Sequence, residues 1–241
     1  MVYSETTNRT GLVQLLEDLT NTQSSSTSSY PVAVKTRDIN MAFDDYQNIV
    51  KQASSTWQAD DTNHTKYPNM TFNVTTTQQD YTFTVDEQSN QVQDIYRVEL
   101  KNPSGVWTLL TPYDEFLEEE AIGARELLTG TPTRYYKTAN GIFLDVTPNY
   151  SSTNGIRMWY TRSPDYFLST DTTKKAGIPN GHHRYLALKP AFWYWLPKDA
   201  AKASLYRNEL STIETSIAKD ISLRNRDERP RLTINQSNSS R

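Results

Sequence analysis

Hydrophobic positions in the first sixty residues repeat with the spacing of a helix. Five apolar residues after Thr10-Gly11 predict a short amphipathic helix of about three turns: Leu12, Val13, Leu15, Leu16 and Leu19. A second, longer helix is predicted from about Lys35 to Gln58, because apolar residues recur every three or four positions along one face. The run SSSTSS between them, Ser24 to Ser29, has the composition of a flexible linker.

The middle of the chain changes to alternating apolar and polar positions, rich in β-branched and aromatic residues. This pattern predicts strands over 71–74, 81–85, 95–101, 106–110, 134–137, 142–146 and 156–162. Two turn signals join neighbouring strands into hairpins, namely Asn102-Pro103-Ser104-Gly105 and Asn140-Gly141. Between the hairpins, a short helix is predicted from Asp114 to Leu128.

Helical spacing returns after Pro179, over 185–196 and again over 200–223. Pro190 and Pro197 are expected to kink or break this stretch, because proline lacks the N–H and clashes with the preceding turn. The final residues, 224–241, are polar and aperiodic and are interpreted as an extended tail.

These elements predict an α+β fold with a helical core formed by the N- and C-terminal helices. The predicted core comprises residues 1–66 and 179–223, the β-rich inserted region residues 67–178, and the extended C-terminal tail residues 224–241. The two sets of helices must pack together to bury their apolar faces, so the β-rich region is expected to project from one end.

Composition indicates a modest core with extensive contact surface. Of 241 residues, 36% are hydrophobic and the mean hydropathy is −0.72, yet there are 5 Trp, 15 Tyr and 7 Phe. Aromatic side chains bury large areas, which indicates a folded chain with surface that partners could cover. The absence of Cys excludes disulfides, thiol nucleophiles and Cys-ligated zinc.

Neither a membrane span nor a secretion signal is predicted. No apolar run approaches the roughly 18 residues that a bilayer requires, and no apolar signal segment follows Met1. We therefore expect a soluble protein made in a cytoplasm, with no membrane partner.

The net charge of −3 hides a strong asymmetry. Residues 1–120 hold 7 Lys+Arg against 18 Asp+Glu, whereas residues 121–241 hold 18 against 10. One interpretation is simple drift of surface charge. The other is that complementary faces meet between copies of the chain, since opposite potentials guide association and fix its register.

The residue patterns of common enzymes are absent, so neither an enzyme nor a cofactor is expected. No GxGxxG, GxxxxGK[ST], GxSxG or HExxH motif occurs. His182-His183 stands at a predicted helix start, where capping or packing is favoured over catalysis, and adjacent helical residues do not easily share a metal. His64 follows Asp60-Asp61, which could bind a cation but equally suits a turn. The prediction is therefore no metal site.

Three parts of the chain are candidates for protein contacts: an aromatic segment, an acidic helix face and the tail. The aromatic segment from Tyr185 to Trp195 is interpreted either as part of the core or as a contact between subunits. The candidate subunit-interface residues are Trp193, Trp195 and the solvated helix face of Glu118, Glu119 and Glu120.

The tail begins with four Arg and two acidic residues: Arg224, Arg226, Asp227, Glu228, Arg229 and Arg231, with Pro230 and Leu232 among them. Arginine forks suit carboxylate or phosphate partners. The run is short and interrupted by acids, so a protein partner is favoured over nucleic acid.

An ordered set of short blocks resembles the head-to-tail adaptor (connector) proteins of tailed double-stranded DNA phages. The blocks cover residues 30 to about 233: Tyr30-Pro31, Thr36 to Asn40, Trp57 to His64, Gln79 to Tyr81, Gly130 to Pro132, Arg162 to Pro164, His183 to Leu188, and Arg226 to Arg231. Each block is weak alone, and their order along the chain gives the resemblance its specificity.

The resemblance implies a structural virion protein at the head-to-tail interface, made in the host bacterial cytoplasm. Such adaptors form a ring, typically a dodecamer, docked on the portal protein. The ring extends the DNA channel, lets genomic DNA pass without sequence-specific binding, and forms the platform for a downstream tail or nozzle protein. It also makes Arg224 to Thr233 the candidate portal-contact segment.

Two other function classes stay open at this point. One is a β-rich receptor- or glycan-binding tail module whose Tyr and Trp residues form the site. The other is a small hydrolase that uses His64 or His182, for which the sequence offers no matching nucleophile.

Overall fold

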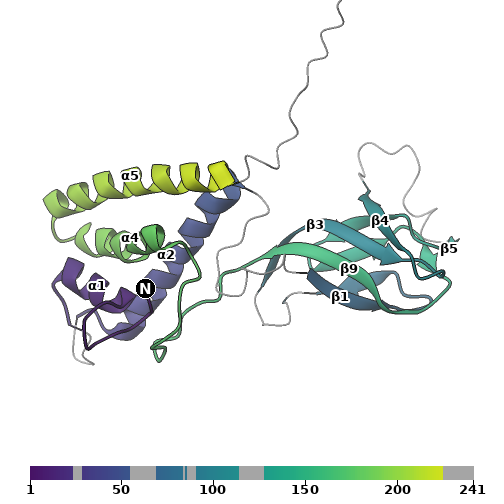
Figure 1. Cartoon of the computed structure of the whole chain (residues 1–241), viewed down its shortest axis with the longest axis horizontal. Coiled ribbons are helices and arrows are strands. Elements are labelled where there is room, and N and C mark those ends of the chain that lie inside the picture. The colour runs from purple at the N-terminus through teal and green to yellow at the C-terminus, as the bar shows by residue number, and fades with distance from the viewer. Residues whose placement is uncertain (24–28, 55–68, 84, 86–90, 114–127, 225–241) are drawn as a thin grey trace, which may run out of the picture.

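Helices gather at one end of the molecule and a β-sheet forms the other end (Figure 1). The computed structural model describes residues 1–23, 29–54, 69–83, 85, 91–113 and 128–224. The helices are α1 (Leu12–Thr20), α2 (Val32–Ala53), the 3-10 turn η1 (Asn180–His182), α4 (His183–Trp195) and α5 (Ala200–Arg224).

The strands lie between the two pairs of helices in the sequence. They are β1 (Asn69–Val74), β2 (Asp80–Thr82), β3 (Val92–Lys101), β4 (Trp107–Pro112), β5 (Thr129–Gly130), β6 (Arg134–Thr138), β7 (Gly141–Leu144), β8 (Thr147–Pro148) and β9 (Ser152–Arg162). The predicted α+β class, with a β-rich region inserted into a helical core, is confirmed.

The helical bundle joins both ends of the chain around one apolar cluster. Helices α1, α2 and α5 all pack against α4, and α5 also packs against α2. The cluster takes buried side chains from every α-helix, among them Leu16, Phe43, Tyr46, Tyr185 and Ile217. Burying these faces is the main stabilising contribution to the bundle.

The first ten residues, which carry no periodic pattern, also belong to the bundle. Tyr3 is fully buried and stacks on Phe167, with ring centroids 4.8 Å apart. Gly11 lets this segment turn into α1, because a Cβ there would lie 2.3 Å from Gln14 Oε1 and 2.4 Å from the Glu5 nitrogen. The role of Gly11 is therefore close approach of the backbone.

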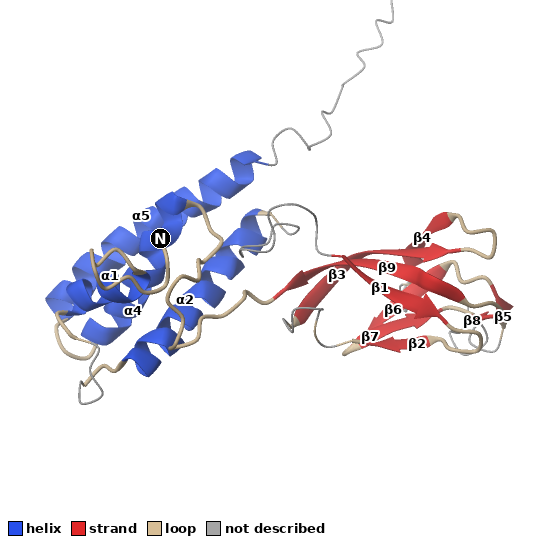
Figure 2. Ribbon diagram, turned by 60° about the horizontal axis from the view of Figure 1, so that its bottom comes forward, coloured by secondary structure: helices blue, strands red, loops and turns tan. Residues whose placement is uncertain are grey.

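The large sheet has seven strands in the order β1-β9-β3-β4-β6-β7-β2 and curls along its length (Figure 2). All neighbours run antiparallel except β4 and β6, which pair over two residues in parallel. One face buries a second apolar cluster that includes Val98, Leu100, Ile156 and Met158. Strands β5 and β8 form a separate two-stranded pair.

Both predicted hairpins form, but the two loop residues of the second hairpin are not the predicted Asn140-Gly141 pair. In the β3–β4 turn Gly105 takes a φ of +80°, and its N–H donates to the Asn102 carbonyl at 2.9 Å. In the β6–β7 turn Thr138 pairs with Gly141, so the loop is Ala139-Asn140, and neither residue has a positive φ. Gly141 is needed because a Cβ would lie 2.4 Å from the Tyr81 carbonyl oxygen.

The helix boundaries correct the predicted bounds of one helix and show at which proline the chain breaks. Helix α2 begins at Val32 and ends at Ala53, since Ser54 takes extended backbone, whereas the prediction ran from 35 to 58. Helix α4 continues through Pro190, so the helix is not broken there. Pro197 lies in the turn before α5 and does separate the two helices.

Several predicted features lie outside the described residues. They are the linker over 24–28, the helix predicted over 114–128 up to residue 127, and the tail from 225 to 241. The segment 55–68, which includes His64, is also outside.

Candidate functional site

The structure describes only part of the residue set singled out from the sequence. Trp193 and Trp195 lie on the last turn of α4, and Arg224 is the final residue of α5. The remaining candidates lie outside the described residues: Glu118, Glu119, Glu120, Arg226, Asp227, Glu228, Arg229, Pro230, Arg231 and Leu232.

Trp193 lies at an open hollow of about 600 Å³ on the surface of the bundle. The lining residues come from the start of α2 and the end of α4: Tyr30, Arg37, Asp38, Met41, Trp193 and Tyr194. Met41 is 50% exposed although it is apolar. Tyr, Trp, Met and Arg are enriched at the centres of protein interfaces, so this lining has the chemistry of a protein contact.

The aromatic wall of the hollow is held in place by hydrogen bonds and stacking. Tyr30 stacks on Tyr194 with ring centroids 4.9 Å apart, and its hydroxyl donates to Asp38 Oδ2 at 2.9 Å. Burial raises the pKa of Tyr30, and the adjacent Asp38 carboxylate raises it further. The Arg37 guanidinium lies 2.8 Å from Asp38 Oδ1 and is largely exposed. The wall is therefore pre-formed, which lowers the entropic cost of binding.

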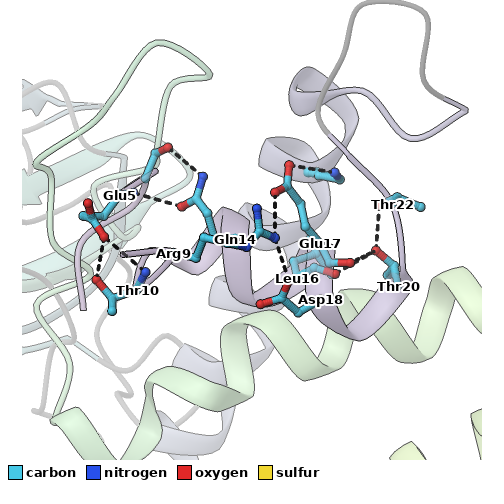
Figure 3. Close-up of polar contacts among 11 residues, drawn as sticks. Glu5, Arg9, Thr10, Gln14, Leu16, Glu17, Asp18, Thr20 and Thr22 are labelled. Carbon is cyan, nitrogen blue, oxygen red and sulfur yellow. Dashed lines mark hydrogen bonds and ion pairs between the residues drawn. The ribbon is translucent and has the colours of Figure 1, made fainter. Parts of the chain in front are cut away.

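Beneath this wall a buried lysine connects α2 to α1. Lys35 is fully buried, and its Nζ lies 5.5 Å from the Tyr30 ring centroid and 3.4 Å from Glu17 Oε1. Burial lowers the pKa of Lys35, and the Glu17 carboxylate opposes that shift. Arg9 approaches the same carboxylate at 3.3 Å and Asp18 at 2.6 Å, as Figure 3 shows.

Figure 3 also shows how the N-terminal segment is fastened to α1. The Glu5 carboxylate accepts the backbone N–H groups of Thr7, Asn8 and Thr10. Desolvation opposes the effect of these bonds, and on balance they lower the pKa of Glu5. Gln14 accepts the Glu5 N–H at 2.9 Å. These bonds fix the loop that leads into α1 and support the helix behind the hollow.

Trp195 makes its polar contact within the chain. Its indole Nε1 donates to the Leu19 carbonyl at 3.0 Å, and the Tyr206 hydroxyl donates to the same oxygen at 2.9 Å. Leu19 lies in the last turn of α1, where carbonyls lack helical partners. Trp195 therefore joins α4 to α1, while the Lys202 ammonium covers its ring at 4.0 Å.

Both adjacent histidines are engaged in the bundle. His182 Nδ1 lies 2.8 Å from the Tyr46 hydroxyl and its Nε2 lies 3.1 Å from Asp220 Oδ2. His183 donates from Nε2 to the Ile178 carbonyl at 3.0 Å, and its Nδ1 faces the Met1 amine at 2.8 Å. They lie at a helix start, as predicted, and their contacts are those of packing; neither caps the helix through its side chain.

A row of cations and indoles covers the polar face of the sheet. Arg157 lies over the Trp107 ring at 4.1 Å and near the Trp159 ring at 5.7 Å, and Arg97 lies 5.3 Å from Trp159. Glu99 pairs with Arg157 at 3.7 Å and accepts from Arg97 at 2.8 Å. The guanidinium groups therefore occupy the faces of these indoles.

The sequence indicated Trp193 but not the other walls of the hollow. Met41 comes from α2 and Tyr30 from the segment just before it, more than 150 residues from Trp193 in the chain. The exposed apolar Met41, one turn after Arg37 on α2, was the available signal.

Within the described residues, no group of His, Asp or Glu side chains is arranged to hold a metal ion. None of the described helices is long and apolar enough to cross a bilayer. No protein-family model matches the chain, and no curated protein matches its sequence.

Proposed function

We propose that this chain is a head-to-tail adaptor (connector) protein of a tailed double-stranded DNA phage. In this proposal about twelve copies form a ring on the portal protein, at the head-to-tail interface of the virion. The ring extends the channel through which genomic DNA passes, without sequence-specific binding, and forms the platform for the downstream tail or nozzle protein.

The observation that carries the proposal is the separation of the helices and the large sheet at opposite ends of the molecule. A helical bundle made from both chain ends occupies one end, and the inserted sheet occupies the other (Figure 1). Each end has its own apolar cluster, and the two clusters share no residue. Such a protomer can contact one neighbour through its helices and another through its sheet. The resemblance of the ordered sequence blocks to adaptors supports the same conclusion.

The chemistry of the surface favours assembly over a reaction. The hollow around Trp193 and Met41 has the residue types of an interface centre. His182, the described candidate for a hydrolase, has both ring nitrogens within hydrogen-bond distance of Tyr46 and Asp220. A general base must reach a substrate proton, and these partners occupy both of its nitrogens.

The alternative of a glycan-binding module finds less support on the sheet. Sugar binding uses the open face of an aromatic ring, for which the described sheet offers Trp107 and Trp159 as its largest rings. Arg157 lies between them over their rings. A guanidinium stacked on an indole would have to be displaced before a sugar could stack there.

Reconstitution with the portal protein of the same virus tests the proposal. We expect the full chain to bind the portal as a closed ring, observed by native mass spectrometry and cryo-electron microscopy. A chain lacking residues 225–241 keeps α5 whole, because α5 ends at Arg224. We expect it to fold, by circular dichroism, and to lose portal attachment.

The outcomes separate the claims clearly. Failure of the full chain to associate with portal, together with binding to host glycans, would favour the receptor-binding alternative. Normal attachment by the shortened chain would overturn the assignment of residues 225–233 to portal contact while leaving the adaptor proposal in place.

A further inference from the structure

The helical bundle and the sheet are joined by a very short length of described chain. Ser163 still belongs to the sheet, because its N–H donates to the Gln91 carbonyl at 2.8 Å. Phe167 already belongs to the bundle, where it is buried between Tyr3 and Phe43. Only residues 164–166 lie between these two anchors. We call them the joint.

One face of α2 runs alongside this joint and contacts it and the residues on either side of it. We call the α2 residues Asn40, Asp44, Gln47 and Lys51 the α2 seam; their spacing of four, three and four places them on one helical face. All four are polar, so the seam contributes directional hydrogen bonds where a second apolar core is lacking.

The contacts of the seam pass in order from the bundle to the sheet. Asn40 pairs with the backbone of Phe167 in both directions, donating at 2.9 Å and accepting at 3.0 Å. Asp44 accepts from the Tyr166 hydroxyl at 2.6 Å. Two further contacts continue the series into the sheet: Gln47 donates to the Arg162 carbonyl, and Lys51 donates to the Gln93 side chain.

The opposite side of the joint is also restrained. Lys174 Nζ lies 2.8 Å from Asp165 Oδ1 and donates to the Tyr166 carbonyl at 2.7 Å. Pro164 is buried, and its ring fixes φ at about −65°. A joint with one rigid residue and contacts on both sides has few backbone torsions left to bend.

We propose that the α2 seam is a brace that holds the sheet at one angle to the helical bundle. Partners bound at the two ends of the molecule are then held in a fixed relation to each other. Removing the seam contacts, while Phe167 stays anchored, frees the joint to bend. The brace follows from these contacts alone, whatever the partners are.

Distances between spin labels in the full chain test the brace. Because the chain has no Cys, introduced cysteines are the sole labelling sites. Labels at Ser104→Cys, in the exposed β3–β4 turn, and Ser211→Cys, on the exposed face of α5, measure the distance between the sheet and the bundle. Asn48→Cys with Ser211→Cys reports within the bundle. For the parent we expect each pair of labels to give one narrow distance distribution in pulsed electron paramagnetic resonance.

The seam variant combines Gln47→Ala, Lys51→Ala and Tyr166→Phe, and it leaves the Asn40 contacts to Phe167 intact. We expect its bundle-to-sheet distribution to become at least about twofold wider, with the within-bundle distribution unchanged. Matched substitutions on the exposed face of α5, Asn208→Ala and Lys219→Ala, should leave both distributions as in the parent.

Two results would overturn the proposal. One is an unchanged bundle-to-sheet width in the seam variant, and the other is a parent distribution already as wide as that of the variant. If the triple variant also disturbs the within-bundle pair, Tyr166→Phe alone replaces it, since this change removes one hydroxyl. A smaller broadening is then expected, and none would refute the brace.

Discussion

At Gly11 the N-terminal segment passes so close to α1 that a side chain does not fit. A Cβ would lie 2.3 Å from Gln14 Oε1, 2.4 Å from the Glu5 nitrogen and 2.8 Å from the Ser4 Cα, while φ at Gly11 is an ordinary −78°. We expect Gly11→Ala to lower the free energy of unfolding by about 1–3 kcal/mol through overpacking, measured by urea denaturation.

Gly181→Ala serves as the matched control for this prediction. Apart from neighbours in the chain, no atom lies within 4 Å of a Cβ placed at Gly181, so the control should be at least as stable as the parent, because alanine restricts the unfolded chain. Equal stability of both variants would show that the segment before α1 shifts without cost.

His183 gives the protein a pH-dependent stability. Burial, followed by the nearby N-terminal amine, lowers the pKa of His183 below its ordinary 6.5. Between the lowered pKa and pH 6.5, the unfolded chain therefore binds a proton that the folded protein does not bind. The contribution of His183 to the free energy of unfolding is fully present above pH 6.5 and is lost as the pH falls toward the lowered pKa. We expect His183→Gln to flatten this part of the stability curve.

Urea denaturation at about pH 7 and about pH 5.5 measures this effect, because carboxylates contribute mostly below that window. The parent should lose more stability than the variant between the two conditions. An identical loss in both proteins would mean that His183 accepts a proton in the folded bundle without cost.

At the scale of the element, periodicity predicted the described α-helices and the seven strands of the large sheet in their order, because apolar faces must be buried, but it missed the short pair β5 and β8. It could not predict which strands pair. Strand β1 lies beside β9, with Phe72 opposite Ile156, more than 80 residues away. The parallel contact between β4 and β6 likewise depends on the way the sheet curls. Tertiary packing decides both.

The Asn140-Gly141 signal predicted the right element for the wrong physical reason. Such a pair usually supplies two residues with positive φ, and here neither has one. The glycine instead makes room for the Tyr81 carbonyl on the neighbouring strand β2. A local signal thus coincided with a non-local requirement that the sequence alone does not display.

The sequence named Trp193 as a candidate interface residue but predicted no hollow, because the opposite wall comes from residues before and within α2. Met41 on that wall is 50% exposed, so a substitution there changes little of the core. If the hollow is a subunit contact, Met41→Lys inserts a charge into an apolar interface. We expect association between copies on the portal to weaken about tenfold or more, with an unchanged melting temperature.

Titration of the chain onto portal protein, followed by native mass spectrometry, measures this association. Leu168→Lys is the control, because Leu168 is exposed and does not line the hollow. If the two variants weaken association equally, the effect comes from added charge in general, and the assignment of the hollow to an interface fails.

At the scale of the whole molecule, most of the negative charge of the first half of the chain lies in three short segments. Residues 1–120 have a net charge of −11, of which −8 belongs to residues outside the described ranges, in 55–68, 86–90 and 114–120. The described α5 and its approach carry exposed cations, among them Lys198, Lys202 and Arg207. Helix α5 as a whole is nearly neutral, with four Lys or Arg against three Asp or Glu. If the chain forms the proposed ring, these exposed cations are candidate partners for the acidic segments of a neighbouring copy.

Glu118, Glu119 and Glu120 supply three of these negative charges in one place. Replacing all three by Gln should slow ring formation on the portal and reduce its dependence on salt, because steering between exposed charges is screened within a Debye length of about 8 Å at physiological ionic strength. Light scattering after mixing, repeated over a range of salt concentrations, gives both the rate and its salt dependence.

Replacing the three by Asp keeps the charge and should preserve the parent rate. A Gln variant that assembles at the parent rate and with the parent salt dependence would place the complementary charges elsewhere, and the subunit contact would then depend on apolar surfaces such as the hollow.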